Sequence, residues 1–184
     1  MLQPSMIRNC RFDEAGQIII LEDTRQQSGK HDNIHKWCAE NGITLMRTKL
    51  LCGDYTLPAD QSICIDTKYG LQEVYSDLIG KDHARFVREL DAAKACGITL
   101  VILVEERGIH SLQDVQNWMN PRLTKWNRTP KAMRHPRPPV ASDQLMKIME
   151  SVSEKHGCDW QFCTRSQTGQ RIYEILMGRE RNDG

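Results

Sequence analysis

The stretch GDYTLPADQSICIDTKYG, residues 53–70, contains the clearest local pattern of the chain. Its central part, SICIDTK, has the apolar composition of a strand, and a turn at Gly53–Asp54 precedes it. Side chains two residues apart on a strand point to the same face, so Asp66 and Lys68 are expected to lie side by side. The stretch therefore predicts a strand that ends in a carboxylate next to an ammonium group, with a second carboxylate in the turn before it.

The segments on either side of this stretch predict an α/β fold. Runs of aliphatic and β-branched residues predict strands, and apolar residues at helical spacing predict helices. Up to residue 106 the expected order is β α β β α α β, with strands at 17–23, 43–51, 62–68 and 98–106 and helices at 31–42, 70–80 and 82–97. A helix at 142–157 that starts with a Ser142–Asp143 cap, a strand at 158–164 and a helix at 166–178 are expected to follow.

The C-terminal helix, strand and helix can complete the same sheet, which favours one domain over two. We therefore expect a single domain over residues 1–184, with its core at about 17–106 and 141–180. A basic, proline-rich insertion at about 117–140 is expected to interrupt this core.

The overall composition limits the class of protein. The chain has 184 residues, and 25 basic against 24 acidic residues give a net charge of +1, which neither requires nor excludes a nucleic-acid partner. No apolar run reaches the roughly 18 residues of a membrane span, and the first residues lack the apolar core of a signal peptide. The seven cysteines form no CxxC pair, which is typical of reduced thiols and makes a zinc site unexpected. We expect a soluble, cytoplasmic protein.

Residues 121–140 differ from the rest of the chain. They include six Arg or Lys residues and five prolines but no acidic residue. This many prolines predicts an irregular loop instead of a helix or strand. Basic side chains around a tryptophan can contact phosphates and stack on bases, although a plain solvated loop is the alternative. The candidate DNA contacts are Arg122, Lys125, Trp126, Arg128, Lys131 and Arg134, with Arg85 and Arg88 at the start of the helix expected at 82–97.

Acidic residues gather at one edge of the expected sheet. Asp23 ends the first strand, Asp54 precedes the third strand, and Asp66 and Lys68 end it. Clustered carboxylates repel one another unless a cation compensates them, and their hard oxygens suit Mg²⁺ or Mn²⁺. A lysine beside such a metal can orient a water and stabilise charge on a phosphate oxygen. The pattern indicates metal-assisted phosphodiester hydrolysis, while the triplet alone also fits a solvated strand end with a weak surface ion pair.

The order of three short motifs helps to decide between metal-assisted hydrolysis and a surface ion pair. DTR at 23–25 ends an apolar strand, GDY at 53–55 lies in a turn, and DTK at 66–68 ends a later strand. This series resembles the XPF-type branch of the PD-(D/E)xK nuclease superfamily over residues 17–106, roughly half of the chain. The resemblance implies a restriction-endonuclease-like fold, which is a mixed central β-sheet flanked by helices, and a stand-alone nuclease of bacterial or phage type.

The resemblance also implies roles for individual residues. Asp54 and Asp66 correspond to metal ligands, Asp23 to a nearby acidic residue that ligates the metal or aids the water, and Lys68 to the catalytic lysine. The implied activity is that of a Mg²⁺- or Mn²⁺-dependent DNA endonuclease that leaves 5′-phosphate and 3′-hydroxyl ends, with branched or flap DNA as candidate substrates. Arg25 and Tyr55, which flank the motif aspartates, are included among the DNA contacts.

The sequence departs from the family pattern at several positions. Gln26 and Thr67 stand where the family has a Glu and an Arg, and Asp66 replaces a Glu, which keeps the charge but shortens its reach. Gln72, with Glu73 beside it, stands where the family has a later Asp and is expected to hydrogen-bond a phosphate or water in the site. These changes leave hydrolysis as the expectation and the substrate preference open.

Two other classes of function stay open. One is a catalytically silent nuclease fold that binds DNA, and the other is a metal-dependent phosphoesterase that acts on RNA or on a nucleotide. The chain lacks the tandem helix-hairpin-helix domain that often accompanies the family, so a homodimer is only a weak expectation. His31 and His35, four residues apart on the first helix, are expected at the surface and not as a metal-binding pair.

Overall fold

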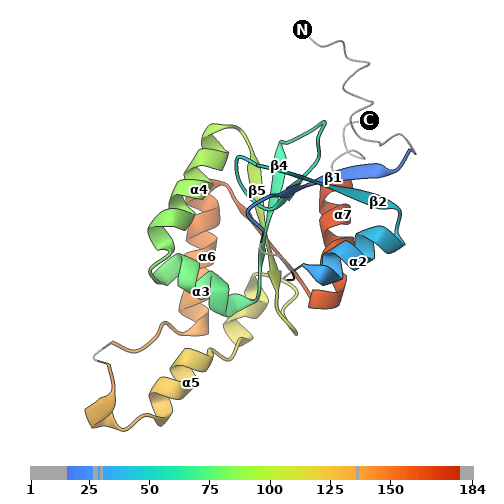
Figure 1. Ribbon diagram of the computed structural model, residues 1–184. Coiled ribbons are helices and arrows are strands. Elements are labelled where there is room, and N and C mark those ends of the chain that lie inside the picture. Colours follow the sequence, from blue (N-terminus) through green and yellow to red (C-terminus); the bar gives the residue numbers. More distant parts are fainter. Residues whose placement is uncertain (1–15, 27–28, 30, 136, 179–184) are drawn as a thin grey trace.

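The computed structural model describes residues 16–26, 29, 31–135 and 137–178. Within this part of the chain, a mixed six-stranded sheet has the order β2-β1-β3-β4-β5-β6 (Figure 1). The strands are β1 (Ile18–Asp23), β2 (Ile43–Thr48), β3 (Tyr55–Thr56), β4 (Ile63–Lys68), β5 (Thr99–Glu105) and β6 (Asp159–Cys163). The helices are α2 (Asp32–Glu40), α3 (Leu71–Ile79), α4 (His83–Ala95), α5 (Pro121–Arg128), α6 (Ser142–His156) and α7 (Thr168–Gly178). The predicted mixed sheet flanked by helices is confirmed.

The strand directions bring the chemically important strand ends together. Strand β1 pairs in parallel with β2, and β4 pairs in parallel with β5. The short strand β3 lies antiparallel between β1 and β4, so β1 and β4 run in the same direction. Their carboxyl ends, at Asp23 and Lys68, therefore meet at the same edge of the sheet.

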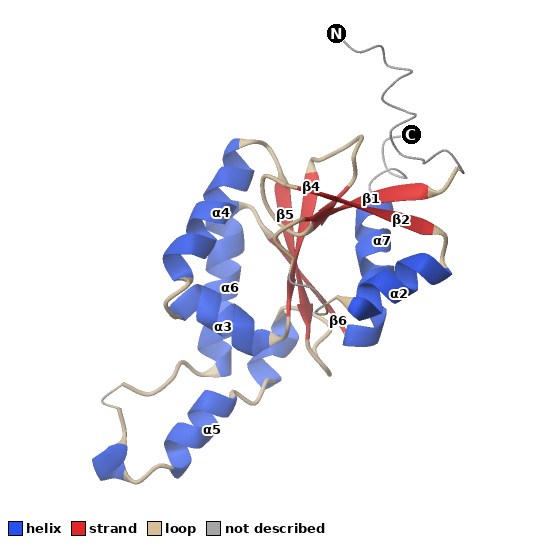
Figure 2. Cartoon of the chain, viewed as in Figure 1, coloured by secondary structure: helices blue, strands red, loops and turns tan. Residues whose placement is uncertain are grey.

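Helices cover both faces of the sheet, and each face has its own apolar core. Figure 2 shows α3, α4 and α6 on one side of the strands and α2 and α7 on the other. The first core includes Phe86, Leu100 and Met149, and the second includes Ile20, Ile34 and Ile172. Burial on both faces explains why β5 is an uninterrupted apolar run, LVILV, without polar alternation. This two-faced packing holds the strand ends in a rigid frame.

The basic segment after the 3-10 helix at Gln113–Asn117 corrects the prediction of an irregular loop. It contains α5 and a 3-10 turn at Lys131–Met133. Pro121 is the first residue of α5, where its missing N–H removes no helical hydrogen bond, and no further proline follows until Pro130. The side chain of Asn120 caps the helix by accepting a hydrogen bond from Arg122 N at 3.0 Å. Counting prolines without regard to their positions therefore led to the wrong prediction.

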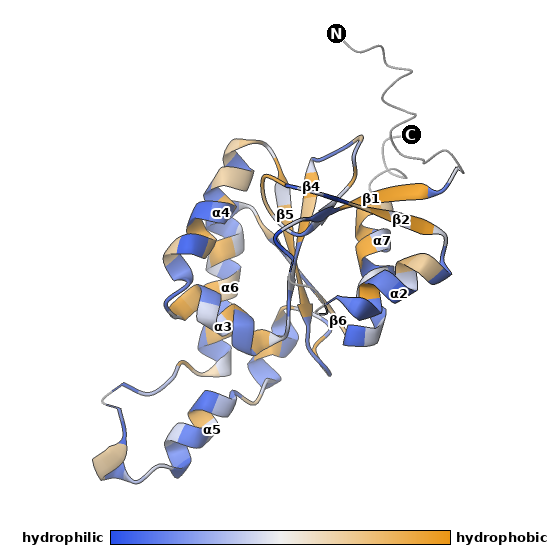
Figure 3. Cartoon of the chain, in the orientation of Figure 1, coloured by the Kyte–Doolittle hydropathy of each residue, from blue (hydrophilic) through white to orange (hydrophobic). Residues whose placement is uncertain are grey.

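We call residues 120–135 the basic arm. Figure 1 shows it projecting from the layer of α3 and α6, away from the sheet, and Figure 3 shows that α5 is mostly hydrophilic. Asn120 is 3% exposed and its Nδ2 donates to Val140 O at 2.8 Å, which ties together the two chain segments where the arm begins and ends. Helix α5 itself buries no residue, so the arm depends on contacts within itself and at its base.

Element boundaries differ from the prediction at three places. Strand β2 ends at Thr48 and not at residue 51, because Lys49 to Leu51 turn toward the site and Leu50 N donates to Asp23. The turn predicted around Gly53 includes the two-residue strand β3. Ser142 was expected to cap α6, but Ala141 occupies the cap position. Among the described helices, none has the length and apolar character that would let it cross a bilayer.

A candidate metal and nucleic-acid site

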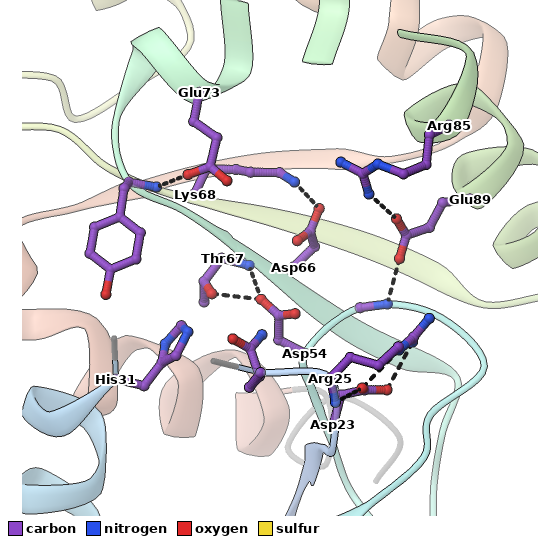
Figure 4. Close-up of a pocket in the computed structure, with 13 residues that line it drawn as sticks. Asp23, Arg25, His31, Asp54, Asp66, Thr67, Lys68, Glu73, Arg85 and Glu89 are labelled. Carbon is purple, nitrogen blue, oxygen red and sulfur yellow. Dashed lines mark hydrogen bonds and ion pairs between the residues drawn. The ribbon is translucent and has the colours of Figure 1, made fainter. Parts of the chain in front are cut away.

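A pocket of about 270 Å³ opens at the carboxyl ends of β1 and β4 (Figure 4). The GDY turn, the starts of α2 and α3 and one face of α4 also contribute to its wall. It is lined by Asp23, Arg25, Gln26, His31, Gly53, Asp54, Asp66, Thr67, Lys68, Tyr69, Glu73, Arg85 and Glu89. The structure thus brings together the four residues Asp23, Asp54, Asp66 and Lys68, which were predicted from separate parts of the sequence.

Asp54 is held in a turn that is clamped between two strands. Its backbone N donates to Ile65 O at 2.6 Å, and its backbone O accepts from Asp23 N at 2.8 Å. Gly53 has a φ of +67°, and an added Cβ there would lie 2.9 Å from Ile65 O, so only glycine fits this close approach. Asp54 Oδ2 accepts from Thr67 N at 2.8 Å and from Thr67 Oγ1 at 2.6 Å. These bonds fix one carboxylate oxygen of Asp54.

Lys68 lies between two buried carboxylates. Its Nζ is 2.8 Å from Asp66 Oδ2 and 2.9 Å from Asp77 Oδ2, and all three side chains are less than 10% exposed. Nζ also lies 5.1 Å from the centre of the Phe86 ring. Asp66 and Lys68 are adjacent as the strand geometry predicted, but the pair is buried, so the alternative of a solvated surface ion pair does not hold.

The buried charges shift one another's pKa values. Burial raises the pKa of Asp66 to about 7; the Lys68 ammonium opposes this shift, and the negative charges of Asp54 and Glu89 add to it. Burial also raises the pKa of Asp54 above its ordinary value, against the hydrogen bonds from Thr67. Burial alone would lower the pKa of Lys68, but Asp66 and Asp77 outweigh it and raise that pKa. Lys68 is therefore a protonated hydrogen-bond donor at neutral pH.

Asp23 lines the pocket, but its carboxylate already accepts four hydrogen bonds. Arg25 donates from its backbone N at 2.6 Å, from Nε at 2.8 Å and from Nη2 at 2.8 Å. Leu50 N donates the fourth at 2.8 Å. Burial acts to raise the pKa of Asp23, but these hydrogen bonds prevail and lower it. This arrangement suits a role in shaping the site better than direct metal ligation, which the sequence had also assigned to Asp23.

The donor set fits a hard divalent cation bound by few protein ligands. Among the residues that the structure describes, no group of three His, Cys, Asp or Glu side chains is arranged to hold a metal by itself. Asp66 is nevertheless buried and Asp54 half-buried, both have raised pKa values, and a cation would relieve the repulsion between the two carboxylates. Mg²⁺ is commonly bound through one or two carboxylates, with waters and substrate phosphates completing its shell. The two residues fit Mg²⁺ or Mn²⁺ in that manner.

Apart from the residues of the basic arm, three predicted site residues lie outside the pocket. Gln72 is exposed on α3, whereas its neighbour Glu73 lines the pocket and accepts a hydrogen bond from Tyr69 N at 2.8 Å. Tyr55 is fully buried, and its hydroxyl donates to Glu22 Oε1 at 3.0 Å, so the expected DNA contact is corrected to a core position. Arg88 is exposed on α4 away from the pocket lining.

The other predicted contacts fall into two groups. Arg25 and Arg85 line the pocket with side chains that are 58% and 57% exposed. The remaining residues, Arg122, Lys125, Trp126, Arg128, Lys131 and Arg134, belong to the basic arm. Two of these hold the arm together, because the Arg134 guanidinium lies 4.5 Å over the Trp126 ring and its Nε donates to Thr129 O at 2.6 Å. The Arg122 guanidinium lies 4.9 Å over the Tyr75 ring of α3.

Several residues in or beside the pocket escaped the sequence analysis. Asp77, on α3, does not line the pocket but contacts Lys68 next to it. Glu89, on α4, accepts from Gly53 N at 3.1 Å and so steadies the turn that carries Asp54. His31 was expected at the surface but is 5% exposed and lines the pocket, while the side chain of His35 is 48% exposed as expected. The helical spacing of Glu73 and Asp77, four residues apart, was the signal that could have revealed this face of α3.

Comparison with solved structures identifies the fold. No protein-family model matches the sequence, and no curated protein matches it significantly. The structure is similar to XPF from Aeropyrum pernix, with a TM-score of 0.57 and 16% identity over 89% of this chain and 66% of that one. A second structure, of XPF from Aeropyrum pernix in complex with DNA, gives a TM-score of 0.58 and 15% identity over 89% and 65%. The chain has an XPF-like fold. It spans about two thirds of the length of those chains.

Proposed function

We propose that this protein is a divalent-metal-dependent DNA endonuclease that hydrolyses phosphodiester bonds, with selectivity for branched or flap DNA. The observation that carries the proposal is the arrangement of the buried pair Asp66 and Lys68 beside the half-buried Asp54 at one open pocket. Buried charges are costly, and strongly shifted pKa values in a cleft are typical of functional sites. The XPF-like fold and the three sequence motifs that line this pocket support the same reaction class.

Each residue of the pocket has a separate part in this proposal. Asp54 and Asp66 would hold the metal, which would supply a water of lowered pKa and positive charge for the phosphate. Lys68 has three N–H donors, and its two ion pairs with Asp66 and Asp77 leave one for the attacking water or a phosphate oxygen. Because Lys68 stays protonated, it acts by positioning and by electrostatic stabilisation, not as a base. In-line attack then gives a 5′-phosphate and a 3′-hydroxyl.

DNA contacts are proposed at two places. Arg25 and Arg85 stand exposed at the pocket and can reach phosphates that flank the scissile bond. The basic arm supplies a second, separate positive surface through Lys125, Arg128 and Lys131, all exposed. The solved complex of the similarly folded XPF with DNA supports this choice of substrate. An arm that projects away from the sheet suits a substrate with more than one duplex arm (Figure 1).

The finer expectations from the sequence stay proposals. We propose one nuclease domain, with the basic arm as its insertion, that acts in the cytoplasm of a bacterial or phage-infected cell. A homodimer is the weakest of these proposals.

A catalytically silent DNA-binding module is the second candidate. The observation that favours it is the absence, among the described residues, of three grouped side chains able to hold a metal without help. The two ion pairs of Lys68 with Asp66 and Asp77 also fit a purely structural charge cluster. A phosphoesterase that acts on RNA has no such specific observation and enters only as a substrate to be tested.

Cleavage of defined substrates tests the proposal. Labelled single-stranded, duplex, flap and four-way-junction DNA, with single-stranded RNA, are incubated with Mg²⁺, Mn²⁺ or EDTA. The variants are Asp66→Asn, which removes one carboxylate of the pocket, and Asp143→Asn, a matched change at an exposed position on α6. We expect metal-dependent cutting of DNA by wild type and by Asp143→Asn and none by Asp66→Asn. DNA binding by Asp66→Asn should be kept or improved, because a negative charge near the phosphate is lost.

The other outcomes separate the candidates. Cutting by Asp66→Asn at the wild-type rate contradicts the site. DNA binding without cutting by wild type, in either metal, favours the silent module. Cutting confined to RNA favours the phosphoesterase.

A further inference from the structure

Two aromatic side chains that belong to none of the three sequence motifs, those of His31 and Tyr69, form one wall of the pocket. The His31 ring centre lies 6.0 Å from that of Tyr69, and the Arg165 guanidinium lies 5.2 Å over the Tyr69 ring. His31 and Tyr69 line the pocket, and Arg165 is exposed beside them. We call these three residues the ring wall. They come from the start of α2, the end of β4 and the segment after β6, so the fold gathers them from three distant parts of the chain.

The apolar core and the end of strand β4 fix the position of the ring wall. His31 is 5% exposed, and its ring meets the buried Tyr55 ring edge-on at 6.1 Å. Tyr69 directly follows Lys68, and its backbone N is bonded to Glu73. Figure 4 shows His31 on the opposite side of Asp54 from Arg85 and Glu89. A DNA strand whose phosphate lies at Asp54 would therefore have the Arg85 guanidinium on one side and the rings of His31 and Tyr69 on the other.

We propose that the ring wall is a nucleotide subsite, in which the base of an unpaired nucleotide next to the scissile phosphate stacks on Tyr69. The proposal rests on the proposed function, since it takes DNA as the occupant of the pocket. A base that is paired inside a duplex has its faces covered by its neighbours and is not free to stack on a protein ring. The wall would thus favour a strand that is single-stranded on one side of the cleaved bond, as at a flap or branch.

The chemistry of the three side chains suits this occupant. An aromatic face stacks on any base, which gives binding without sequence readout. Burial raises the pKa of Tyr69 against the opposing charge of Arg165, so its phenol is neutral at pH 7. Arg165, whose guanidinium lies over the Tyr69 ring, brings a positive charge for the adjoining phosphate. The same contacts would also serve to brace α2 against β4, and a test must separate the two roles.

Binding measurements with DNA strands that have bases and with strands that lack them separate the stacking role from the bracing role. The probes are a fluorescein-labelled oligo-dT 12-mer and a 12-mer of abasic sugar-phosphate, which keeps the phosphates and has nothing to stack. Affinities are measured in EDTA for wild type, Tyr69→Ala, Tyr69→Phe and Arg165→Ala. Arg171→Ala is the matched control, because Arg171 is a half-exposed arginine paired with Glu174 on α7. Thermal unfolding of each variant shows whether it has kept its fold.

We expect Tyr69→Ala to weaken oligo-dT binding about tenfold and to leave abasic binding within twofold of wild type. Tyr69→Phe should bind both strands as wild type does, since it keeps the ring. Arg165→Ala should weaken both strands by about threefold to tenfold through the phosphates, and Arg171→Ala should change neither. The proposal is overturned if Tyr69→Ala weakens oligo-dT binding less than threefold, or weakens both strands equally. Arg165→Ala, which removes no buried side chain, keeps the test open should Tyr69→Ala not fold: wild-type oligo-dT binding by Arg165→Ala overturns the proposal.

The subsite and the proposed hydrolysis can be rejected separately. A base-dependent loss in Tyr69→Ala with no cleavage in Mg²⁺ or Mn²⁺ leaves the subsite standing and removes the hydrolysis. Metal-dependent cleavage with equal oligo-dT binding by wild type and Tyr69→Ala leaves the hydrolysis standing and removes the subsite.

Discussion

Lys68 Nζ lies 2.9 Å from Asp77 Oδ2, a contact that links the end of β4 to the middle of α3. Asp77 is 3% exposed, and its other oxygen lies 3.4 Å from Arg85 Nη2. Without Asp77, the ammonium would have only Asp66 as a buried counter-ion. Asp77 thus keeps Lys68 protonated and in position when Asp66 also binds a metal. We infer that Asp77 is a positioning residue for the lysine.

The variant Asp77→Asn tests this role. It keeps the size and a hydrogen-bonding oxygen but removes the charge, so Lys68 should move toward Asp66. We expect cleavage to fall by about tenfold to a hundredfold, because small displacements of a catalytic group have effects of that size. Stability should fall by about 1–3 kcal/mol. Single-turnover cleavage and urea unfolding measure the two effects, and Asp143→Asn, exposed on α6, is the matched control. Wild-type cleavage by Asp77→Asn would contradict the inference.

The raised pKa of Asp66 predicts how stability depends on pH. The pKa is about 7 in the folded protein against 3.8 ordinarily, so the contribution of this group to stability is complete below about pH 4 and is lost as the pH rises through 7. Asp66→Asn cannot ionise and escapes this loss. In EDTA, the free energy of unfolding of the variant relative to wild type should therefore increase from pH 5 to pH 8, by an amount of the order of a few kcal/mol. A difference that stays constant with pH would show that Asp66 titrates normally.

The parts of the site that the sequence could predict are those set by local geometry. Asp66 and Lys68 are two apart on a strand, and the strand period alone places them together. The helix that follows shows the limit of such reasoning. Gln72 and Glu73 are adjacent, but a helix turns by about 100° per residue, so only one of them can face the pocket. The burial of Leu71 and Val74 sets that phase, and motif spacing does not reveal it.

Contacts between distant elements lay beyond the sequence for a different reason. The meeting of Asp77 with Lys68 depends on how α3 packs over the sheet, and the inward turn of His31 depends on the Tyr55 and Tyr69 rings around it. Tyr55 was misplaced because it adjoins a motif aspartate, and strand alternation sends its side chain to the opposite face from Asp54. Each of these is decided by tertiary packing.

Gly53→Ala is expected to displace Asp54. The φ of +67° is unfavourable for alanine by about 1–2 kcal/mol, and the new Cβ would also meet Ile65 O at 2.9 Å and Cys64 Cβ at 3.2 Å. Gly97→Ala is a close control, because Gly97 has a φ of +69° with nothing within 4 Å of the added Cβ. Both variants should lose the backbone contribution, measured by urea unfolding, but only Gly53→Ala should lose more and also cleave DNA more slowly. Equal losses in the two variants would mean that the turn tolerates the close approach.

The basic arm should contribute to DNA affinity without contributing to the fold. Lys125, Arg128 and Lys131 are exposed, and α5 buries no residue, so changing all three to Gln should alter the free energy of unfolding by no more than about 0.5 kcal/mol per site. If each contacts a phosphate of a junction DNA, the slope of log K against log salt should become shallower by up to about 3, because each lost phosphate contact removes about 0.9.

The matched control replaces three exposed lysines of the body, Lys36, Lys147 and Lys155, with Gln. It changes the net charge by the same amount, so a general charge effect would alter its salt slope equally. Fluorescence anisotropy at four salt concentrations in EDTA gives both slopes. A shallower slope for the arm variant alone assigns the phosphate contacts to the arm, because counterion release counts only the charges that lie against DNA. If the arm variant and the control variant have the same salt slope, the arm does not contact the phosphates. The exposed arginines at the pocket would then carry the binding.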